Sequence, residues 1–241
     1  MPSAAVIIIG NEILTGKFPD ENAPYLIRRL RELGVDLVRI VVIPDVIEII
    51  GAEVAAAARM CDYVYTTGGV GPTHDDLTMA GIAHAFGVPV RRHPALEAVL
   101  RERMGDAVNE AALRMAEVPE GAELWWDGDV RFPLVVKANV AIFPGVPALL
   151  KYKFEAVAHR YVGIRVECRR LWTLESEPTI ADHLTEAAAR WPMVAIGSYP
   201  RFELTPHRVL VTLESRELDA LIACEGYLRA GMSTCPDPTA T

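Results

Sequence analysis

Thr66-Thr67-Gly68-Gly69-Val70-Gly71-Pro72-Thr73-His74-Asp75-Asp76-Leu77-Thr78 is the stretch that decides the fold. It lies between residues 62–67, which read as a short buried strand, and residues 77–86, which have the apolar spacing of a helix. Its three glycines and two adjacent carboxylates therefore fall at a junction between strand and helix. Such junctions are where α/β proteins hold phosphates and metal ions.

The alternation of strand and helix extends back to the N-terminus. Residues 4–9 are continuously apolar and mostly β-branched, as in a strand covered on both faces. A helix is expected over 22–33, a strand over 37–43 and a second helix over 47–60. This β-α-β-α-β-α order predicts an α/β fold with a mostly parallel sheet and right-handed crossovers.

The pattern changes near Gly163, beyond which a strand, a helix, two strands and a final helix are expected. That order is typical of a small α+β lobe with an antiparallel pair of strands. We therefore expect an α/β domain over 1–163, a small α+β lobe over 164–234 and a disordered tail over 235–241.

Composition restricts the function classes. The 241 residues carry a net charge of -8, and no basic patch of the kind that binds nucleic acid is visible. No stretch approaches the ~20 apolar residues that cross a bilayer, so no membrane partner is expected and a cytoplasmic location is the default. The four cysteines and six histidines are too dispersed for a disulfide framework or a zinc site.

Four separate segments with unusual residues follow predicted strands: Gly10-Asn11-Glu12, Pro44-Asp45, the block over 66–78, and Pro144-Gly145-Val146-Pro147. The carboxyl ends of parallel strands share one edge of the sheet, where ligands bind. The four segments are therefore expected to meet at one crevice. The expected ligand-binding residues there are Gly10, Asn11, Asp45, Thr67, Gly68, Gly69, Gly71, Pro72, Thr73, Thr78, Pro144 and Gly145.

The glycines have two explanations. Strand-to-helix turns often need a positive φ, which glycine adopts at low cost. Alternatively, the missing side chains let backbone N–H groups approach a phosphate. Neither GxxxxGK[ST] nor GxGxxG is present, which argues against a P-loop kinase and a dinucleotide oxidoreductase.

The two adjacent carboxylates favour a metal ion. Thr73 and Asp76 can cap the helix that follows, and one acid suffices for that role. Asp75 is then spare, and two carboxylates beside a phosphate would repel it unless a divalent cation lay between them. We expect Mg²⁺ or another divalent cation at Asp75 and Asp76. Glu12 could complete the site or act as a base, or simply cap a turn.

Other polar residues near the same edge stay ambiguous. Asp45 could bind a ribose or the backbone of a neighbouring loop, but Pro44-Asp45 is equally explained as an ordinary turn. Asp20 and Asn22 could touch a ligand, although a helix cap explains Asn22 adequately. His74 could protonate a leaving phosphate, but a solvent-facing loop histidine explains it as well.

Three of the motifs together carry a family resemblance. Gly10-Asn11-Glu12-Ile13-Leu14, the block over 66–78 and Pro144-Gly145-Val146-Pro147 resemble, in that order, the molybdopterin-binding (MoaB/Mog-like) domain family over about residues 4–160. The form Gly-Pro-Thr-x-Asp-Asp looks like the subgroup of competence/damage-inducible protein A and the N-terminal domain of FAD synthase. Phe143-Pro144-Gly145-Val146-Pro147-Ala148-Leu149-Leu150 and the lobe after 165 look closer to the latter.

The resemblance implies a three-layer α/β/α fold, a pocket for a pterin or nucleotide phosphate, and a divalent metal near Asp75 and Asp76. It also implies metal-dependent hydrolysis of nucleotide pyrophosphates such as FAD or ADP-ribose, and self-association into a homo-oligomer. In such a hydrolase we expect Asp75 and Asp76 to hold the cation and Glu12 or a metal-bound water to deprotonate the nucleophile, so Glu12, Asp75 and Asp76 are the expected catalytic residues. Where many relatives have a second acid after the residue matching Asp45, this chain has Val46.

Three functional hypotheses follow. The first is a metal-dependent nucleotide pyrophosphohydrolase. The second is molybdopterin binding or adenylation in cofactor assembly, with molybdopterin as the ligand. The third is a non-catalytic ligand-binding module in which the acid pair only caps a helix. Each takes a small-molecule nucleotide or pterin as its partner.

Overall fold

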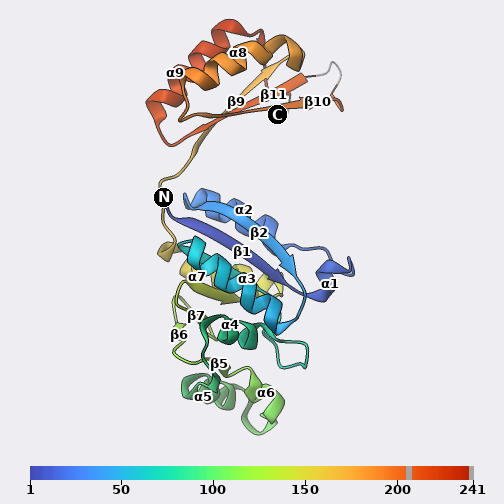
Figure 1. Cartoon of the computed structure of the whole chain (residues 1–241), viewed down its shortest axis with the longest axis vertical. Coiled ribbons are helices and arrows are strands. Elements are labelled where there is room, and N and C mark those ends of the chain that lie inside the picture. Colours follow the sequence, from blue (N-terminus) through green and yellow to red (C-terminus); the bar gives the residue numbers. More distant parts are fainter. Residues whose placement is uncertain (205–207, 239–241) are drawn as a thin grey trace. The chain divides into compact units, whose positions relative to one another are not determined.

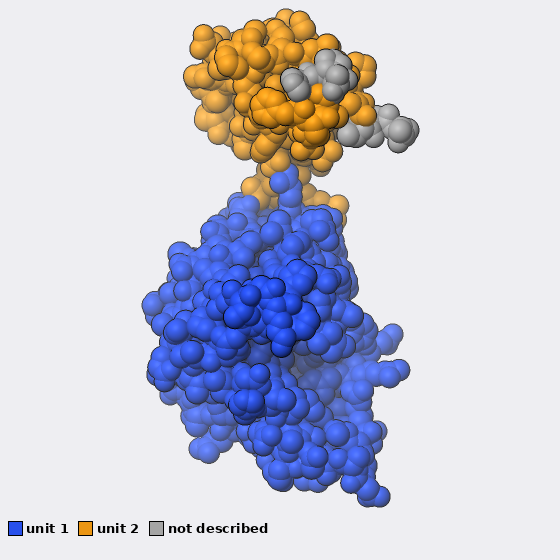
Figure 2. All heavy atoms as spheres, turned by 90° about the vertical axis from the view of Figure 1, so that its right-hand side faces the viewer, with its two compact units in different colours: residues 1–163 blue, residues 164–241 orange. Residues whose placement is uncertain are grey.

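The computed structural model describes residues 1–204 and 208–238 and divides the chain into two compact units, Met1–Gly163 and Ile164–Thr241 (Figure 2). Each unit has its own core and is described separately. The first contains every residue that the sequence predicts for the ligand site. Among the described residues, no helix combines the length and apolar character needed to cross a membrane.

The first unit is built on a six-stranded sheet in the order β2-β1-β3-β8-β7-β6 (Figure 1). Strands β2, β1, β3 and β8 pair in parallel, whereas β7 pairs antiparallel with both β8 and β6. The strands span Ser3–Ile9 (β1), Asp36–Ile43 (β2), Tyr63–Thr67 (β3), Glu123–Trp125 (β6), Leu134–Lys137 (β7) and Val140–Phe143 (β8). The predicted α/β fold with a mostly parallel sheet is confirmed.

Helices cover both faces of this sheet, which makes three layers (Figure 1). On one face lie α2 (Asn22–Glu32) and α7 (Pro147–Val157), with Leu26 and Phe154 in the core. On the other lie α3 (Ile47–Met60), α4 (Thr78–Phe86) and α5 (Pro94–Met104). Alternate residues of β1 point into the two cores, which is why that strand is apolar throughout.

Several short elements were not anticipated from the sequence. They are α1 (Asn11–Leu14), the antiparallel pair β4 (Val90–Arg92) and β5 (Glu117–Pro119), and η1 (Gly105–Ala107). All are three or four residues long. Elements of this length show too few positions for a periodic pattern, so they escape prediction from periodicity. The short helices α6 (Glu110–Arg114) and η2 (Ala158–Arg160), in contrast, lie in stretches whose apolar residues predict helix.

The second unit is a four-stranded antiparallel sheet in the order β10-β11-β9-β12 with two helices. Its elements are β9 (Glu167–Thr173), α8 (Glu177–Arg190), β10 (Ala195–Arg201), β11 (Arg208–Ser215), α9 (Leu218–Gly231) and β12 (Thr234–Cys235). The expected disordered tail over 235–241 is wrong for Cys235, which pairs with Trp172. Residues 239–241 of that tail lie outside the described residues.

Candidate functional site

The carboxyl ends of the four parallel strands meet at one edge of the sheet, as the sequence predicts. The backbone N–H of Asn11, after β1, donates to Asp45 Oδ2, after β2, at 2.9 Å. Thr67 Oγ1, at the end of β3, donates to the carbonyl of Pro144, after β8, at 3.0 Å. Hydrogen bonds thus connect the segments in pairs, and together these segments form the candidate site.

The glycine-rich loop is held close to the backbone around it. Gly68 and Gly69 have φ angles of 103° and 60°, in the region that favours glycine. A Cβ on Gly68 would lie 2.0 Å from the carbonyl oxygen of Ile9, so no side chain fits there. Thr78 is buried, its N–H donates to the carbonyl of Gly69, and its hydroxyl donates to that of Gly68. Thr78 therefore fixes the loop and does not present its hydroxyl to a ligand, in contrast to the expectation.

The adjacent acids have separate environments. Asp76 Oδ2 accepts from the backbone N–H of Thr73 at 2.8 Å and from its hydroxyl at 2.5 Å. Asp75 has a side chain that is 66% exposed, with His74 Nδ1 3.9 Å from its carboxylate. Thr73 lowers the pKa of Asp75 through a side-chain hydrogen bond. Helix α4 begins at Thr78 after Leu77 with no side-chain cap, so the expected capping role of Thr73 and Asp76 is wrong.

Asp45 accepts a hydrogen bond from the backbone of the neighbouring loop, at Asn11, whereas binding of a ribose by Asp45 stays a prediction. Burial raises the pKa of its carboxyl, the hydrogen bond from Asn11 lowers it, and the negative charges of Glu12 and Asp75 raise it further. The carboxylates of Glu12 and Asp75 are thus each near enough to repel that of Asp45. Repulsion of this kind is relieved by a bound cation or a proton.

Asn22 is a tertiary clamp, and its interpretation as a helix cap is wrong. Its side-chain amide donates to Thr67 Oγ1 at 2.9 Å and to the carbonyl of Gly145 at 2.8 Å. The N-cap position of α2 is Glu21, and Asp20, one residue earlier, accepts from the backbone N–H groups of Asn22 and Ala23. Asn22 therefore joins the start of α2 to the ends of β3 and β8.

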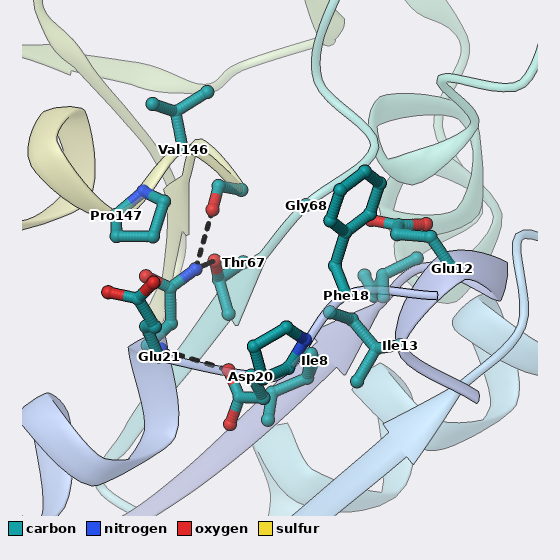
Figure 3. A pocket seen from close by; sticks show the side chains of 14 residues that line it. Ile8, Glu12, Ile13, Phe18, Asp20, Glu21, Thr67, Gly68, Val146 and Pro147 are labelled. Atoms are coloured by element: carbon teal, nitrogen blue, oxygen red, sulfur yellow. Dashed lines mark hydrogen bonds between the residues drawn. The ribbon is translucent and has the colours of Figure 1, made fainter. Parts of the chain in front are cut away.

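A small cavity of about 310 Å³ opens beside this clamp (Figure 3). Figure 3 shows Phe18 and Glu12 on one side of it and Val146, Pro147 and Glu21 on the other. The remaining lining residues are Ile8, Ile9, Ile13, Pro19, Asp20, Asn22, Thr67, Gly68 and Gly145. Its charged lining residues are all acidic, so it suits an uncharged ring better than a phosphate.

A larger cavity of about 990 Å³ adjoins the glycine loop and shares Glu12, Gly68, Gly145 and Val146 with the small one. Glu12 and Asp76 bring two carboxylates to it. Three cations also line it, namely Arg103, Arg131 and Lys153. The rest of the lining is mostly apolar and includes Met79, Leu100, Met115, Phe132, Pro133, Val135, Ile142 and Leu149.

Some of the predicted site residues line these cavities, and the others do not. The larger cavity is lined by Glu12, Gly68, Gly69, Gly71, Asp76, Pro144 and Gly145, and the small one adds Thr67. Neither is lined by Gly10, Asn11, Asp45, Pro72, Thr73, Asp75 or Thr78. Among the described residues, no group of three or more His, Cys, Asp or Glu could hold a metal ion. A cation at Asp76 and Glu12 would therefore take most of its ligands from water and phosphate, as Mg²⁺ does.

Sequence reasoning missed two residues that shape the larger cavity. Arg114 of α6 donates through Nε and Nη2 to the carbonyl of Pro72 and so anchors the far end of the glycine loop. Lys153 of α7 donates to the carbonyls of Phe132 and Pro133 at 2.8 and 2.6 Å. Burial lowers its pKa to about 8. Lys153 lies four residues from both Leu149 and Val157, so in a helix it shares a face with two apolar residues, and a lysine at such a position is the signal that could have identified it.

The predicted family resemblance is confirmed by comparison with known proteins. Residues 5–163 match the family described as "Probable molybdopterin binding domain", and residues 165–235 match "FAD synthase, middle domain". The chain belongs to the molybdopterin-binding domain family. It is 36% identical over 214 residues to a protein of Archaeoglobus fulgidus, a match that covers 88% of this chain and 90% of the relative.

Similarity extends to a longer relative and to a solved structure. It is 34% identical over 255 residues to a probable FAD synthase of Caenorhabditis elegans, covering 94% of this chain and 49% of that protein. The chain spans about half the length of this relative. Among solved structures, the protein CinA of unknown function from Thermoplasma acidophilum superposes with a TM-score of 0.61 at 29% identity, covering 67% of this chain and 99% of that one.

Proposed function

We propose that this protein is a divalent-metal-dependent nucleotide pyrophosphohydrolase that acts on diphosphates such as FAD or ADP-ribose. The observation that carries the proposal is the larger cavity, in which the backbone of the glycine loop lies beside two carboxylates, Glu12 and Asp76. Its volume of about 990 Å³ lies at the upper end of the range for small-molecule sites, which suits a ligand of dinucleotide size.

Each part of the cavity has a chemical role in this proposal. Gly69 and Gly71 line the cavity, and their backbone N–H groups donate to no acceptor within the described residues, so they would bind the diphosphate, whereas the N–H of Gly68 donates to the carbonyl of Phe143. Glu12 is exposed and accepts the proton of the attacking water, whose oxygen forms a bond to phosphorus as the bridging P–O bond breaks. The products are two monophosphates, one of which is a nucleoside monophosphate.

The chemistry of the acids fits a divalent cation. Asp76 uses Oδ2 for Thr73, and its Oδ1 accepts no hydrogen bond within the described residues. Asp75 is exposed on the neighbouring turn, and Glu12 raises the pKa of Asp45 by repulsion. Mg²⁺ or a similar ion bound by Asp76 with Asp75 or Glu12 would offset this repulsion and neutralise the charge that develops on the phosphate oxygens.

Product analysis tests the proposal. The purified protein is incubated with FAD or ADP-ribose and Mg²⁺, Mn²⁺ or Co²⁺, and nucleoside monophosphate is measured by chromatography. We expect turnover that chelation abolishes and that Glu12→Gln and Asp76→Asn each reduce about a hundredfold or more. Asp182→Asn, an exposed acid of the second unit, is the matched control. Binding of FAD or ADP-ribose without formation of nucleoside monophosphate in the presence of any of these metal ions would refute the proposed hydrolase activity.

Molybdopterin binding is the second candidate, favoured by the family description that matches residues 5–163. The same glycine loop and edge would then hold the pterin phosphate. This candidate predicts tight binding of the pterin without hydrolysis of FAD or ADP-ribose. It also predicts that the protein restores molybdoenzyme activity in a strain that lacks this step of cofactor assembly.

A further inference from the structure

The larger cavity contains more positive than negative charge, although the protein as a whole carries a net charge of -8. Its three cations, Arg103, Arg131 and Lys153, form no ion pair with a carboxylate within the described part of the chain. Other arginines of this unit, such as Arg29 and Arg160, are paired with acids. The unpaired cations of the cavity are therefore available to a ligand.

Lys153 is the most constrained of the three. Two of its three N–H groups donate to the carbonyls of Phe132 and Pro133, and its ammonium lies 5.2 Å from the centre of the Phe132 ring. These contacts leave the third N–H without a partner in the described residues. The adjacent Tyr152 hydroxyl donates to the carbonyl of Asp129, so α7 fixes the whole segment that carries Arg131. An ammonium held in this way needs little reorganisation to bind an anion.

This positive end is separate from the acidic end of the cavity. Asp76 lies against Gly71 in the glycine loop, and Glu12 lies against Gly10. Lys153 is six residues beyond Pro147, the first residue of α7, which corresponds to about 9 Å along the helix axis. A diphosphate on the glycine loop would thus leave the Lys153 end for a different group of the same ligand.

We propose that Lys153, with Arg131 and Arg103 at the rim, forms a second anion subsite in the larger cavity. It would bind a phosphate or carboxylate group that the ligand carries beyond its diphosphate. The inference rests on the proposed function for the assignment of the diphosphate to the glycine loop. FAD and ADP-ribose carry no anionic group besides the diphosphate, so the subsite extends the substrate class to nucleotide diphosphates that carry an additional anionic group near one end.

Calorimetric titration of the intact protein tests the subsite. Adenosine diphosphate is first bound to saturation at the glycine loop, and inorganic phosphate or acetate is then titrated in separate experiments. We expect the variant Lys153→Met to weaken phosphate or acetate binding about tenfold or more, whereas the affinity for adenosine diphosphate stays within twofold. Tighter binding of phosphate than of acetate by the parent protein would identify the additional anionic group of the ligand as a phosphate. Tighter binding of acetate would identify it as a carboxylate.

Lys151→Met is the matched control, since it removes the same charge from the same helix. Lys151 does not line the cavity, and its ammonium lies 5.8 Å from the centre of the Tyr25 ring. Equal effects of the two variants, or no effect of Lys153→Met, would overturn the subsite. An equal loss of adenosine diphosphate affinity in Lys153→Met would overturn it too, because Lys153 would then belong to the diphosphate site. Absence of adenosine diphosphate binding contradicts the proposed function instead, and titration of phosphate alone still tests Lys153.

Discussion

Asn22 and Gly145 are 123 residues apart in the chain, yet the side-chain amide of Asn22 donates to the Gly145 carbonyl at 2.8 Å. The same amide donates to Thr67 Oγ1, which in turn donates to the carbonyl of Pro144. Asn22 is 5% exposed, and its Oδ1 is buried without a partner among the described residues. Asn22 therefore connects the end of β3 to the Pro144-Gly145 edge, in addition to the pairing of β3 with β8.

Replacing Asn22 should weaken ligand binding, whereas a replacement elsewhere with a similar loss of stability should not. Asn22→Ala leaves the Gly145 carbonyl without its donor but also removes the unpartnered Oδ1, so we expect a loss of about 1–2 kcal/mol in the free energy of unfolding. Asn139→Ala is the matched control, because Asn139 also donates to two carbonyls, those of Ala58 and Cys61. Urea unfolding should show similar losses for both, while adenosine diphosphate titration should show weaker binding only for Asn22→Ala. Equal binding by the two variants would contradict the clamp.

Asn22 also shows where sequence reasoning reaches its limit. The strands, the main helices and the meeting of four segments at one edge follow from local periodicity and from the geometry of parallel sheets. Asn22 is the first residue of a helix, where its type is common for local reasons, and its actual partners come from two distant segments. Nothing in the neighbouring sequence indicates such partners, so local sequence predicts only a helix cap at Asn22.

Asp75, Asp76 and Lys153 also have surroundings that local sequence does not predict. Asp75 and Asp76 are adjacent in sequence, but only Asp76 lines the larger cavity. Adjacent residues in a turn point in different directions, and this direction depends on φ and ψ angles that composition does not fix. Lys153 belongs to a helix whose position was predicted, but its contacts are with a segment about twenty residues earlier in the chain.

Gly68 should be the glycine of the loop that tolerates substitution least. Its φ is 103°, and an added Cβ would lie 2.0 Å from the Ile9 carbonyl oxygen. We expect Gly68→Ala to reduce the free energy of unfolding by roughly 3 kcal/mol or more. Gly226→Ala, in α9 with no atom near the added methyl, should instead gain about 0.5–1 kcal/mol from helix propensity. Thermal unfolding compares the two, and a Gly68→Ala protein as stable as the parent would show that the loop is not held against β1.

Removal of the acid charges should affect cation binding and leave thermal stability almost unchanged. Neither Asp75 nor Asp76 caps α4, and Asp75 is largely exposed, so Asp75→Asn should melt within about 1 °C of the parent near pH 7. Because the pKa of Asp75 is lowered in the fold, its stabilising contribution is present above the ordinary carboxyl range and is lost as the pH falls through the lowered pKa. Titration with Mn²⁺ should show weaker binding for Asp75→Asn with Asp76→Asn than for the parent. A large loss of stability with unchanged Mn²⁺ affinity would assign the pair a structural role.

Lys153 should make stability depend on pH in the alkaline range. Burial lowers its pKa to about 8 in the fold, whereas an unfolded lysine titrates near ~10.4. Between these values the unfolded chain binds the proton and the folded chain does not, so the free energy of unfolding gains a positive slope with pH. We expect urea unfolding of the parent to show this contribution between about pH 8 and 10, and Lys153→Met to lack it. Lys151→Met should retain the slope. A parent slope identical to that of Lys153→Met would show that Lys153 keeps its proton throughout this range and that its ammonium is better solvated than its position in the cavity indicates.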